Sequence, residues 1–239
     1  MELLAELAAF LTAPTTWAGP NSIPTRLLEH IVLSGLSVII GGLVAVPVGL
    51  YIGHTGRAGL LAVSVANIGR AIPSLALLLI LFPFFGLSYG LALTALVLLA
   101  IPPILTNAYV GLREVDRDLV EAGRGMGMNE PQLLFRVELP AALPVILSGV
   151  RTAAVQVVAT ATLAAFVAGG GLGRYIVDGL ARRNEVLLLA GAVLVALLAV
   201  LTERLFAFFE TRLVSPGIRV DARRLVMSHP EMAAARPPA

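Results

Sequence analysis

The amino-acid sequence predicts an all-α transmembrane protein. Of the 239 residues, 58% are hydrophobic and only 13% are charged, which leaves too little polar surface to cover a soluble domain of this size. The apolar residues are also grouped into stretches of about twenty, the length that a helix needs to cross the hydrocarbon layer. These two observations place the chain in the class of helical membrane proteins.

Five stretches are long and apolar enough to be spans, and they cover residues 31–52, 60–82, 89–110, 143–167 and 186–206. The second and third are separated only by Pro-Phe-Phe-Gly-Leu-Ser, which predicts a tight hairpin. Glycine and proline inside membrane helices are typical of kinks and close helix contacts, and we expect both at Gly41, Gly42, Pro47, Gly69 and Pro73. The chain from 31 to 206 is therefore expected to form one transmembrane domain.

The two ends of the chain are different in character. Residues 1–30 begin with an amphipathic stretch and continue into a turn-rich segment, without the basic region and long apolar core of a secretory signal. Residues 207–239 are polar and rich in proline and alanine, which predicts a disordered tail. Three of its arginines could contact anionic headgroups or simply be solvated: Arg219, Arg223 and Arg224.

The arginines predict the orientation in the membrane. The segments 53–59, 111–142 and 207–239 would share one side and hold ten arginines, whereas the opposite side holds four. Basic residues are retained on the cytoplasmic side. We therefore expect the N-terminus, with segment 1–30, outside and the C-terminus inside the cell.

Composition also excludes several classes of function. The chain has no cysteine and no lysine, which rules out thiol chemistry and a phosphate-binding loop with lysine. Its net charge of +2 and scattered arginines do not indicate nucleic-acid binding. The histidines stand apart, at His30, His54 and His229, and no pair of carboxylates lies within a span for acid–base chemistry. We expect neither an enzyme nor a cofactor or metal site.

The loop 112–142 has its own local structure. Residues 116–126 are good helix formers with an amphipathic pattern, and Gly127 can supply a left-handed turn. Asn129 fits the N-cap of a second short helix, with Pro131 in its first turn and Gln132 completing a capping box. The loop is therefore predicted to be helix, glycine turn, helix, ahead of Pro140 and Pro144, which punctuate the start of the next span.

The same loop resembles a known family. Permease subunits of ATP-binding cassette importers carry a cytoplasmic pattern of Glu-Ala-Ala, three residues, Gly, nine residues, Ile, one residue and Leu-Pro. This chain has that spacing with glycine for the second alanine and valine for isoleucine, at Glu121, Ala122, Gly123, Gly127, Val137, Leu139 and Pro140. Segments 72–79, 134–153 and 160–180 extend the resemblance to osmoprotectant uptake permeases, which carry glycine betaine, choline, carnitine or proline.

The resemblance implies a five-helix type I importer permease fold, with cytoplasmic coupling helices between the third and fourth spans. In such importers these helices dock on a separate ATPase subunit, a second permease completes the pathway, and an extracytoplasmic solute-binding protein delivers the solute. The location implied is the inner membrane of a prokaryote. Within the loop, Glu121 would orient the first helix near Arg124 or a partner cation, and Leu139-Pro140 would fix the return into the membrane.

Two further groups of residues are candidates for function. Arg70 is an intramembrane charge beside a proline kink, so Arg70, Pro73 and Ser74 are candidates for the pathway or a gate; structural pairing of Arg70 is the alternative. The glycine-rich segment 169–184 predicts an interfacial or re-entrant helix, with Asp178 and Arg182 as an ion pair one turn apart. By resemblance it faces the binding protein, with gating or packing as alternatives, through Gly169, Gly170, Gly171, Gly173 and Asp178.

Other functions remain open at this point. A permease for another small solute, such as an amino acid, would carry the same loop pattern. A secondary transporter driven by an ion gradient would be expected to show internal repeats and acidic groups within the membrane. No repeat is evident, and the centres of the predicted spans hold essentially no Asp or Glu. The loop could instead be a surface helix lying on the lipid headgroups, and the chain a membrane scaffold without transport.

Overall fold

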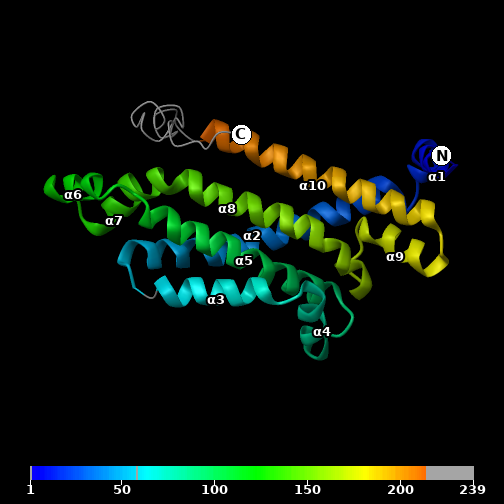
Figure 1. The fold of residues 1–239 in the computed structure, drawn as a ribbon, viewed down its shortest axis with the longest axis horizontal. Coiled ribbons are helices and arrows are strands. Elements are labelled where there is room, and N and C mark those ends of the chain that lie inside the picture. Colours follow the sequence, from blue (N-terminus) through cyan, green and yellow to red (C-terminus); the bar gives the residue numbers. More distant parts are fainter. Residues whose placement is uncertain (1, 58, 214–239) are drawn as a thin grey trace, which may run out of the picture.

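A computed structural model describes residues 2–57 and 59–213, and helices form nearly all of this described part (Figure 1). The α-helices are α1 (Glu2–Thr12), α2 (Ile23–Thr55), α3 (Gly59–Ala71), α4 (Ser74–Phe85), α5 (Tyr89–Arg113), α6 (Arg117–Gly125), α7 (Glu130–Leu133), α8 (Leu139–Thr160), α9 (Gly173–Arg182) and α10 (Glu185–Leu213). Two 3₁₀ segments, Pro14–Thr16 and Ala161–Val167, and a π-helical segment, Leu134–Glu138, complete the fold. The predicted all-α class is confirmed.

Four helical segments of the described chain are long and apolar enough to cross a membrane: Ile23–Thr55, Tyr89–Arg113, Glu130–Val167 and Glu185–Leu213. They correspond to the first, third, fourth and fifth predicted spans, and each is longer than predicted. The last helix continues to Leu213, so the first residues of the predicted tail are helical. The rest of that tail, including the three arginines considered for headgroup contact, lies outside the described residues.

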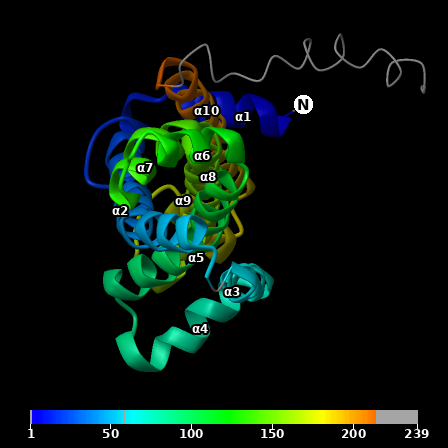
Figure 2. The same cartoon turned by 90° about the vertical axis from the view of Figure 1, so that its left-hand side faces the viewer.

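The predicted second span is not one helix but two, because the chain breaks between α3 and α4. Pro73 has no N–H and is extended, with ψ of 132°, and a proline also disfavours helical geometry at the residue before it. At 13 and 12 residues, each helix is about 18–20 Å long, shorter than the roughly 30 Å of hydrocarbon. Figure 2 shows α4 standing away from the bundle.

The predicted hairpin between the second and third spans is also shorter than expected. Helix α4 continues through Pro83 to Phe85, and the chain then turns at Gly86, where φ is +61°. Ser88 caps α5 by accepting the Leu91 N–H at 3.2 Å. The reversal therefore occupies three residues.

Glycines on α2 allow that helix to lie very close to α5. A Cβ built on Gly41, Gly49 or Gly53 would lie 2.9, 2.6 or 2.7 Å from the Cβ of Ala100, Ala108 or Leu112, respectively. Such small residues let helix backbones approach in membranes. The predicted close contact is confirmed at Gly41, whereas Gly42 faces open space and Pro47 lies inside an unbroken helix.

These contacts also give the topology. Positions 41, 49 and 53 of α2 meet positions 100, 108 and 112 of α5 in the same order, so the two helices run parallel. The chain between parallel neighbours must cross back, and the broken pair α3 and α4 makes that crossing. The bundle thus has five passes, four by long helices and one by two short ones, with α5 and α8 at its buried centre.

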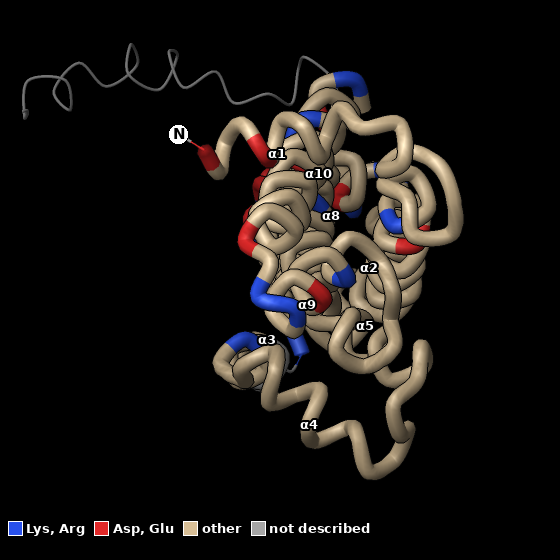
Figure 3. The backbone as a smooth tube through the Cα atoms, turned by 90° about the vertical axis from the view of Figure 1, so that its right-hand side faces the viewer, with Lys and Arg blue, Asp and Glu red and all other residues tan. Residues whose placement is uncertain are grey.

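The two ends of the bundle carry different short helices. Figure 1 places α6 and α7 at one end and α1 and α9 at the other. Figure 3, viewed from the α1 and α9 end, shows acidic and basic residues around α9 and the neighbouring helix ends, whereas α4 carries none. The fold therefore separates the 112–142 loop from the glycine-rich segment by the length of the bundle.

Candidate functional site

The 112–142 loop forms the predicted helix, glycine turn, helix. Asp116 caps α6, since its Oδ1 accepts the Asp118 N–H at 2.9 Å. Helix α6 ends at Gly125, and Gly127 has φ of +81°, in the left-handed region that favours glycine. Nothing lies within 4 Å of where a Cβ on Gly127 would be, so the backbone angle alone accounts for glycine at this position.

The second helix begins with the predicted capping box. The Gln132 N–H donates to Asn129 Oδ1, and the Asn129 N–H donates to Gln132 Oε1, both at 3.0 Å. Two backbone donors at the start of α7 are thereby satisfied by side chains. Pro131 lies in the first turn, where its missing N–H costs nothing.

The chain does not break at Leu139-Pro140, contrary to the expected punctuation before the fourth span. Helical structure is continuous from Glu130 to Val167. Pro140 cannot donate to the preceding turn and its ring crowds the carbonyl four residues back. The helix accommodates this by widening to a π-helix at Leu134–Glu138, where the Leu139 N–H bonds to the Leu134 carbonyl. The loop therefore passes into α8 without an interruption.

Gly123 lies at the contact between the two halves of the loop. It is buried, and a Cβ built there would lie 2.8 Å from Leu133 Cδ1 and 3.7 Å from Val137 Cγ2. Leu133 is itself fully buried. The glycine thus leaves room for the Leu133 side chain, which gives a packing reason for the departure from alanine in the family pattern.

A polar network ties this loop to the end of α2. His54 Nδ1 lies 2.5 Å from Glu138 Oε2, and His54 Nε2 lies 3.2 Å from Glu130 Oε2. Glu130 also faces Arg124, with Arg124 Nη2 at 3.3 Å. Glu138 is buried, at 6% exposed. This network was not predicted from the sequence, in which Glu138 is a lone carboxylate between the apolar Val137 and Leu139.

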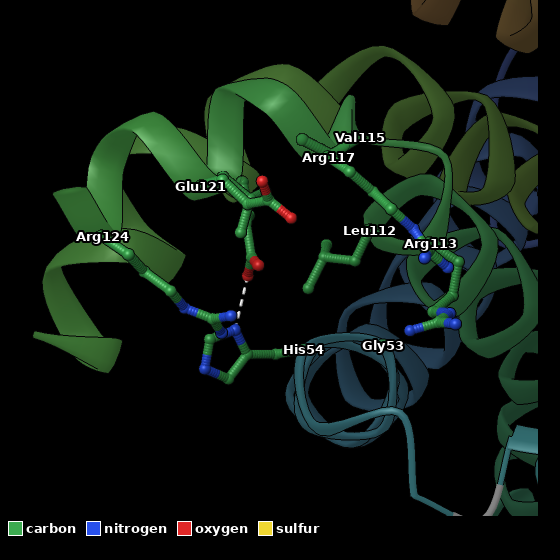
Figure 4. Close-up of a pocket in the computed structure, with 10 residues that line it drawn as sticks. Gly53, His54, Leu112, Arg113, Val115, Arg117, Glu121 and Arg124 are labelled. Atoms are coloured by element: carbon green, nitrogen blue, oxygen red, sulfur yellow. Dashed lines mark hydrogen bonds and ion pairs between the residues drawn. The ribbon is translucent and has the colours of Figure 1, made fainter.

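Beside the network lies a cavity of about 340 Å³. Its lining residues come mostly from α2, α5, α6 and the π-helical segment, and Figure 4 shows the labelled ones of α2, α5 and α6 around it. Glu121 and Arg124 both line it, as expected for neighbours, but Arg124 forms its ion pair with Glu130. The charged and histidine side chains around the cavity are His54, Arg113, Arg117, Glu121, Arg124 and Glu138.

At the opposite end, the glycine-rich segment packs on the start of α2. Gly170 and Gly171 have φ of +70° and +77°. Glu29 Oε2 accepts the Gly171 N–H at 2.8 Å and also pairs with Arg26 Nη1 at 2.9 Å. A Cβ on Gly170 would lie 2.7 Å from that same carboxylate oxygen. The glycines are therefore needed for this contact, whose partners on α2 the sequence did not reveal.

The interfacial helix predicted after these glycines is α9, but its predicted ion pair is wrong. Asp178 pairs with Arg174, one turn earlier, with Arg174 Nη2 at 2.8 Å, rather than with Arg182. Tyr175 on the same helix donates to the Asn21 carbonyl at 2.7 Å. Burial raises the pKa of the Tyr175 hydroxyl, so it stays a neutral donor.

The third group of candidates lies at the break between α3 and α4. Arg70 is exposed in the last turn of α3, Pro73 is in the break itself, and Ser74 begins α4. The structure thus brings these three residues together at the predicted kink. It places them on the side of the bundle where α3 and α4 pack on α5 (Figure 2).

Several known proteins are similar to this chain in sequence. The family described as binding-protein-dependent transport system inner membrane component matches residues 45–215. The carnitine transport permease protein OpuCB of Listeria monocytogenes is 40% identical over 199 residues, 83% of this chain and 91% of that protein. The choline transport system permease protein OpuBB of Bacillus subtilis (strain 168) is 39% identical over 194 residues, 81% and 89% of the two chains.

A solved structure shares the fold. An inward-facing form of the MetNI methionine ABC transporter matches 85% of this chain and 100% of its own, with a TM-score of 0.72 and 23% sequence identity. At this identity the likeness concerns the arrangement of helices.

Proposed function

Because this chain belongs to the family of inner-membrane components of binding-protein-dependent transport systems, and is thus a permease subunit of an ATP-driven importer, we propose that its solute is a small osmoprotectant. The candidates are glycine betaine, choline, carnitine and proline. The supporting observation is that permeases named for carnitine and choline are 40% and 39% identical over more than four fifths of this chain. The methionine transporter is similar in fold at 23% identity, and that likeness carries no argument about the solute of this chain.

We further propose that the 112–142 loop couples the permease to a separate ATPase subunit, which hydrolyses the ATP. The loop lies at one end of the bundle and carries two short helices with side-chain caps at both starts. Such capped helices suit the transmission of a displacement between packed bodies. The residues assigned to this role are Glu121, Ala122, Gly123, Gly127, Val137, Leu139 and Pro140.

In this proposal the loop is cytoplasmic and the α1 and α9 end is external. The arginine count supports that orientation, with ten arginines on the loop side and four on the other. The segment with Gly169, Gly170, Gly171, Gly173 and Asp178 then faces the solute-binding protein. Five passes enclose too little space for a pathway, so a second permease subunit, identical or related, would complete it.

The break between α3 and α4 is our candidate for the pathway or its gate. Arg70 is exposed there rather than packed into the bundle, and Pro73 and Ser74 mark a change of helix direction (Figure 2). A guanidinium would attract the carboxylate of betaine, carnitine or proline and would not attract choline, which has none. The residue thus favours carboxylate-bearing solutes within the proposed class.

Uptake by reconstituted vesicles tests the function. The permease is incorporated with its ATPase subunit and solute-binding protein, and uptake of labelled betaine, choline, carnitine and proline is measured with and without ATP. We expect uptake of at least one of them that requires ATP and both partners. Uptake driven by a proton or sodium gradient alone would identify a secondary transporter. ATP-dependent uptake restricted to amino acids other than proline would identify the alternative substrate class.

A further inference from the structure

His54 joins the end of α2 to the 112–142 loop across 84 positions of sequence. It lies in the last turn of α2, with 14% of its side chain exposed, and faces Glu138 at 2.5 Å and Glu130 at 3.2 Å. Each ring nitrogen therefore faces one carboxylate oxygen, with Nδ1 toward Glu138 and Nε2 toward Glu130.

The bond to Glu138 differs from a surface ion pair. Glu138 is 6% exposed and lies in the π-helical segment, where the loop passes into α8. By contrast, Arg124 and Glu130 have side chains 54% and 59% exposed, and such exposed pairs contribute little. A buried carboxylate that loses its partner is strongly disfavoured. The His54–Glu138 contact is therefore held firmly.

The contact gives the loop a third attachment to the bundle. The loop is covalently joined to α5 ahead of α6 and to α8 after the π-helical segment. His54 adds α2, next to Gly53, whose close approach to Leu112 fixes α2 against α5. A body attached at three points cannot pivot about its two chain connections alone.

We propose that His54 and Glu138 are positioning residues for coupling, whose bond transmits a displacement of α6 and α7 to α2. The inference rests on the proposed function, in which an ATPase subunit moves this loop. With the bond in place, α2, α5 and α8 follow the loop together. Without it, the loop would move against the end of α2, and ATP hydrolysis would be less effective in switching the pathway.

A distance measurement tests the link directly. The chain has no cysteine, so spin labels can be placed at Tyr51→Cys on α2 and Met126→Cys beside α6, which are 60% and 72% exposed. In the complex with the ATPase subunit, we expect the same narrow label-to-label distance without nucleotide and with ATP. In His54→Ala, ATP should shift or broaden it. An equal ATP-dependent shift with His54 intact would overturn the inference.

The coupling ratio, solute taken up per ATP hydrolysed, provides the second readout. We expect His54→Ala to lower it several-fold while the complex still assembles and hydrolyses ATP. His54→Gln keeps a donor toward Glu138 and should recover part of it, as should the exchange of His54→Glu with Glu138→His. Arg57→Ala, which removes an exposed charge at the same helix end, should keep the unmutated ratio. An unchanged ratio in His54→Ala would refute the role.

The two readouts separate this inference from the proposed function. The distance measurement needs the ATPase subunit but no solute, so an incorrect substrate assignment leaves it decisive. Absence of ATP-driven uptake by the unmutated complex, with the distances behaving as expected, would refute the proposed solutes and leave the link intact. Should His54→Ala fail to assemble, the comparison of His54→Gln with Arg57→Ala decides the outcome.

Discussion

At the scale of single residues, two glycines in the 112–142 loop lack a side chain for different physical reasons. Gly127 has φ of +81° and open space around it, whereas Gly123 has ordinary helical geometry and lies against Leu133. The first position is restricted by backbone conformation and the second by volume. Different substitutions should therefore be tolerated at each.

At Gly127, tolerance should follow the left-handed propensity of the new residue. Gly127→Leu places a Cβ in a conformation that costs about 1–2 kcal/mol for most residues, whereas asparagine is among the few non-glycine residues that adopt it. We expect Gly127→Leu to insert normally and to lower uptake per ATP hydrolysed, and Gly127→Asn to stay close to the unmutated protein. Equal behaviour of the two variants in vesicle uptake would show that the turn angle does not matter for coupling.

At Gly123, the limit should be the Leu133 side chain. Gly123→Ala improves helix propensity by up to about 1 kcal/mol, but its Cβ would lie 2.8 Å from Leu133 Cδ1. Overpacking of this kind typically costs about 1–3 kcal/mol, so we expect a lower melting temperature of the purified complex. Gly123→Ala with Leu133→Val should recover it. Additive losses in the double variant would contradict the packing explanation.

At the scale of elements, the parallel contact between α2 and α5 depends on glycines of α2 that lie in the contact. Gly49 and Gly42 lie seven positions apart on one helix, yet a Cβ would meet Ala108 Cβ at 2.6 Å at Gly49 and nothing within 4 Å at Gly42. We expect Gly49→Ala to destabilise the protein by about 1–3 kcal/mol and Gly42→Ala to be neutral or slightly stabilising. Thermal melts in detergent compare the two, and a loss at Gly42 equal to that at Gly49 would refute the contact geometry.

The elements were predictable where their causes are local. The capping box of Asn129 and Gln132 and the turn at Gly127 depend on neighbours within a few residues. The sequence predicts both features, and the structure has them. The sequence predicts only a kink at Pro73, where the structure has a break. Hydropathy averaged over twenty residues does not show the effect of one proline on a single turn. The start of α2 was placed too late, since Glu29 is polar in sequence but is bonded to Gly171 in the fold.

The parts of the site that the sequence did not reveal depend on long-range contacts. Glu138 stands at a position of the loop pattern that carries no expectation, and His54 lies 84 positions away. Only the fold brings the end of α2 beside the π-helical segment. Likewise, Arg174 and Arg182 both lie four residues from Asp178, so spacing alone allows either ion pair. In the structure Asp178 pairs with Arg174.

At the scale of the whole molecule, five passes bring the start of α2 and the end of α10 toward opposite ends of the bundle (Figure 1). The parallel arrangement of α2 and α5 requires a return between them, and α3 with α4 supplies it even though neither is long enough alone. The 112–142 loop and α9 are then separated by the crossing of α8. This topology is independent of the arginine count, which is used only to predict which side faces the cytoplasm.

Labelling of single cysteines tests both the crossing by α8 and the orientation of the 112–142 loop. The unmutated chain has no cysteine and serves as the unlabelled control. Met126→Cys beside α6 and Arg182→Cys at the end of α9 are exposed positions at opposite ends of the bundle. With a membrane-impermeant maleimide on cells whose outer side is accessible, we expect Arg182→Cys to react at once and Met126→Cys only after permeabilisation. The reverse pattern would place the 112–142 loop outside, where no ATPase subunit could reach it, and so refute the coupling role. Reaction of both positions in intact cells would contradict the crossing by α8, on which the five-pass arrangement depends.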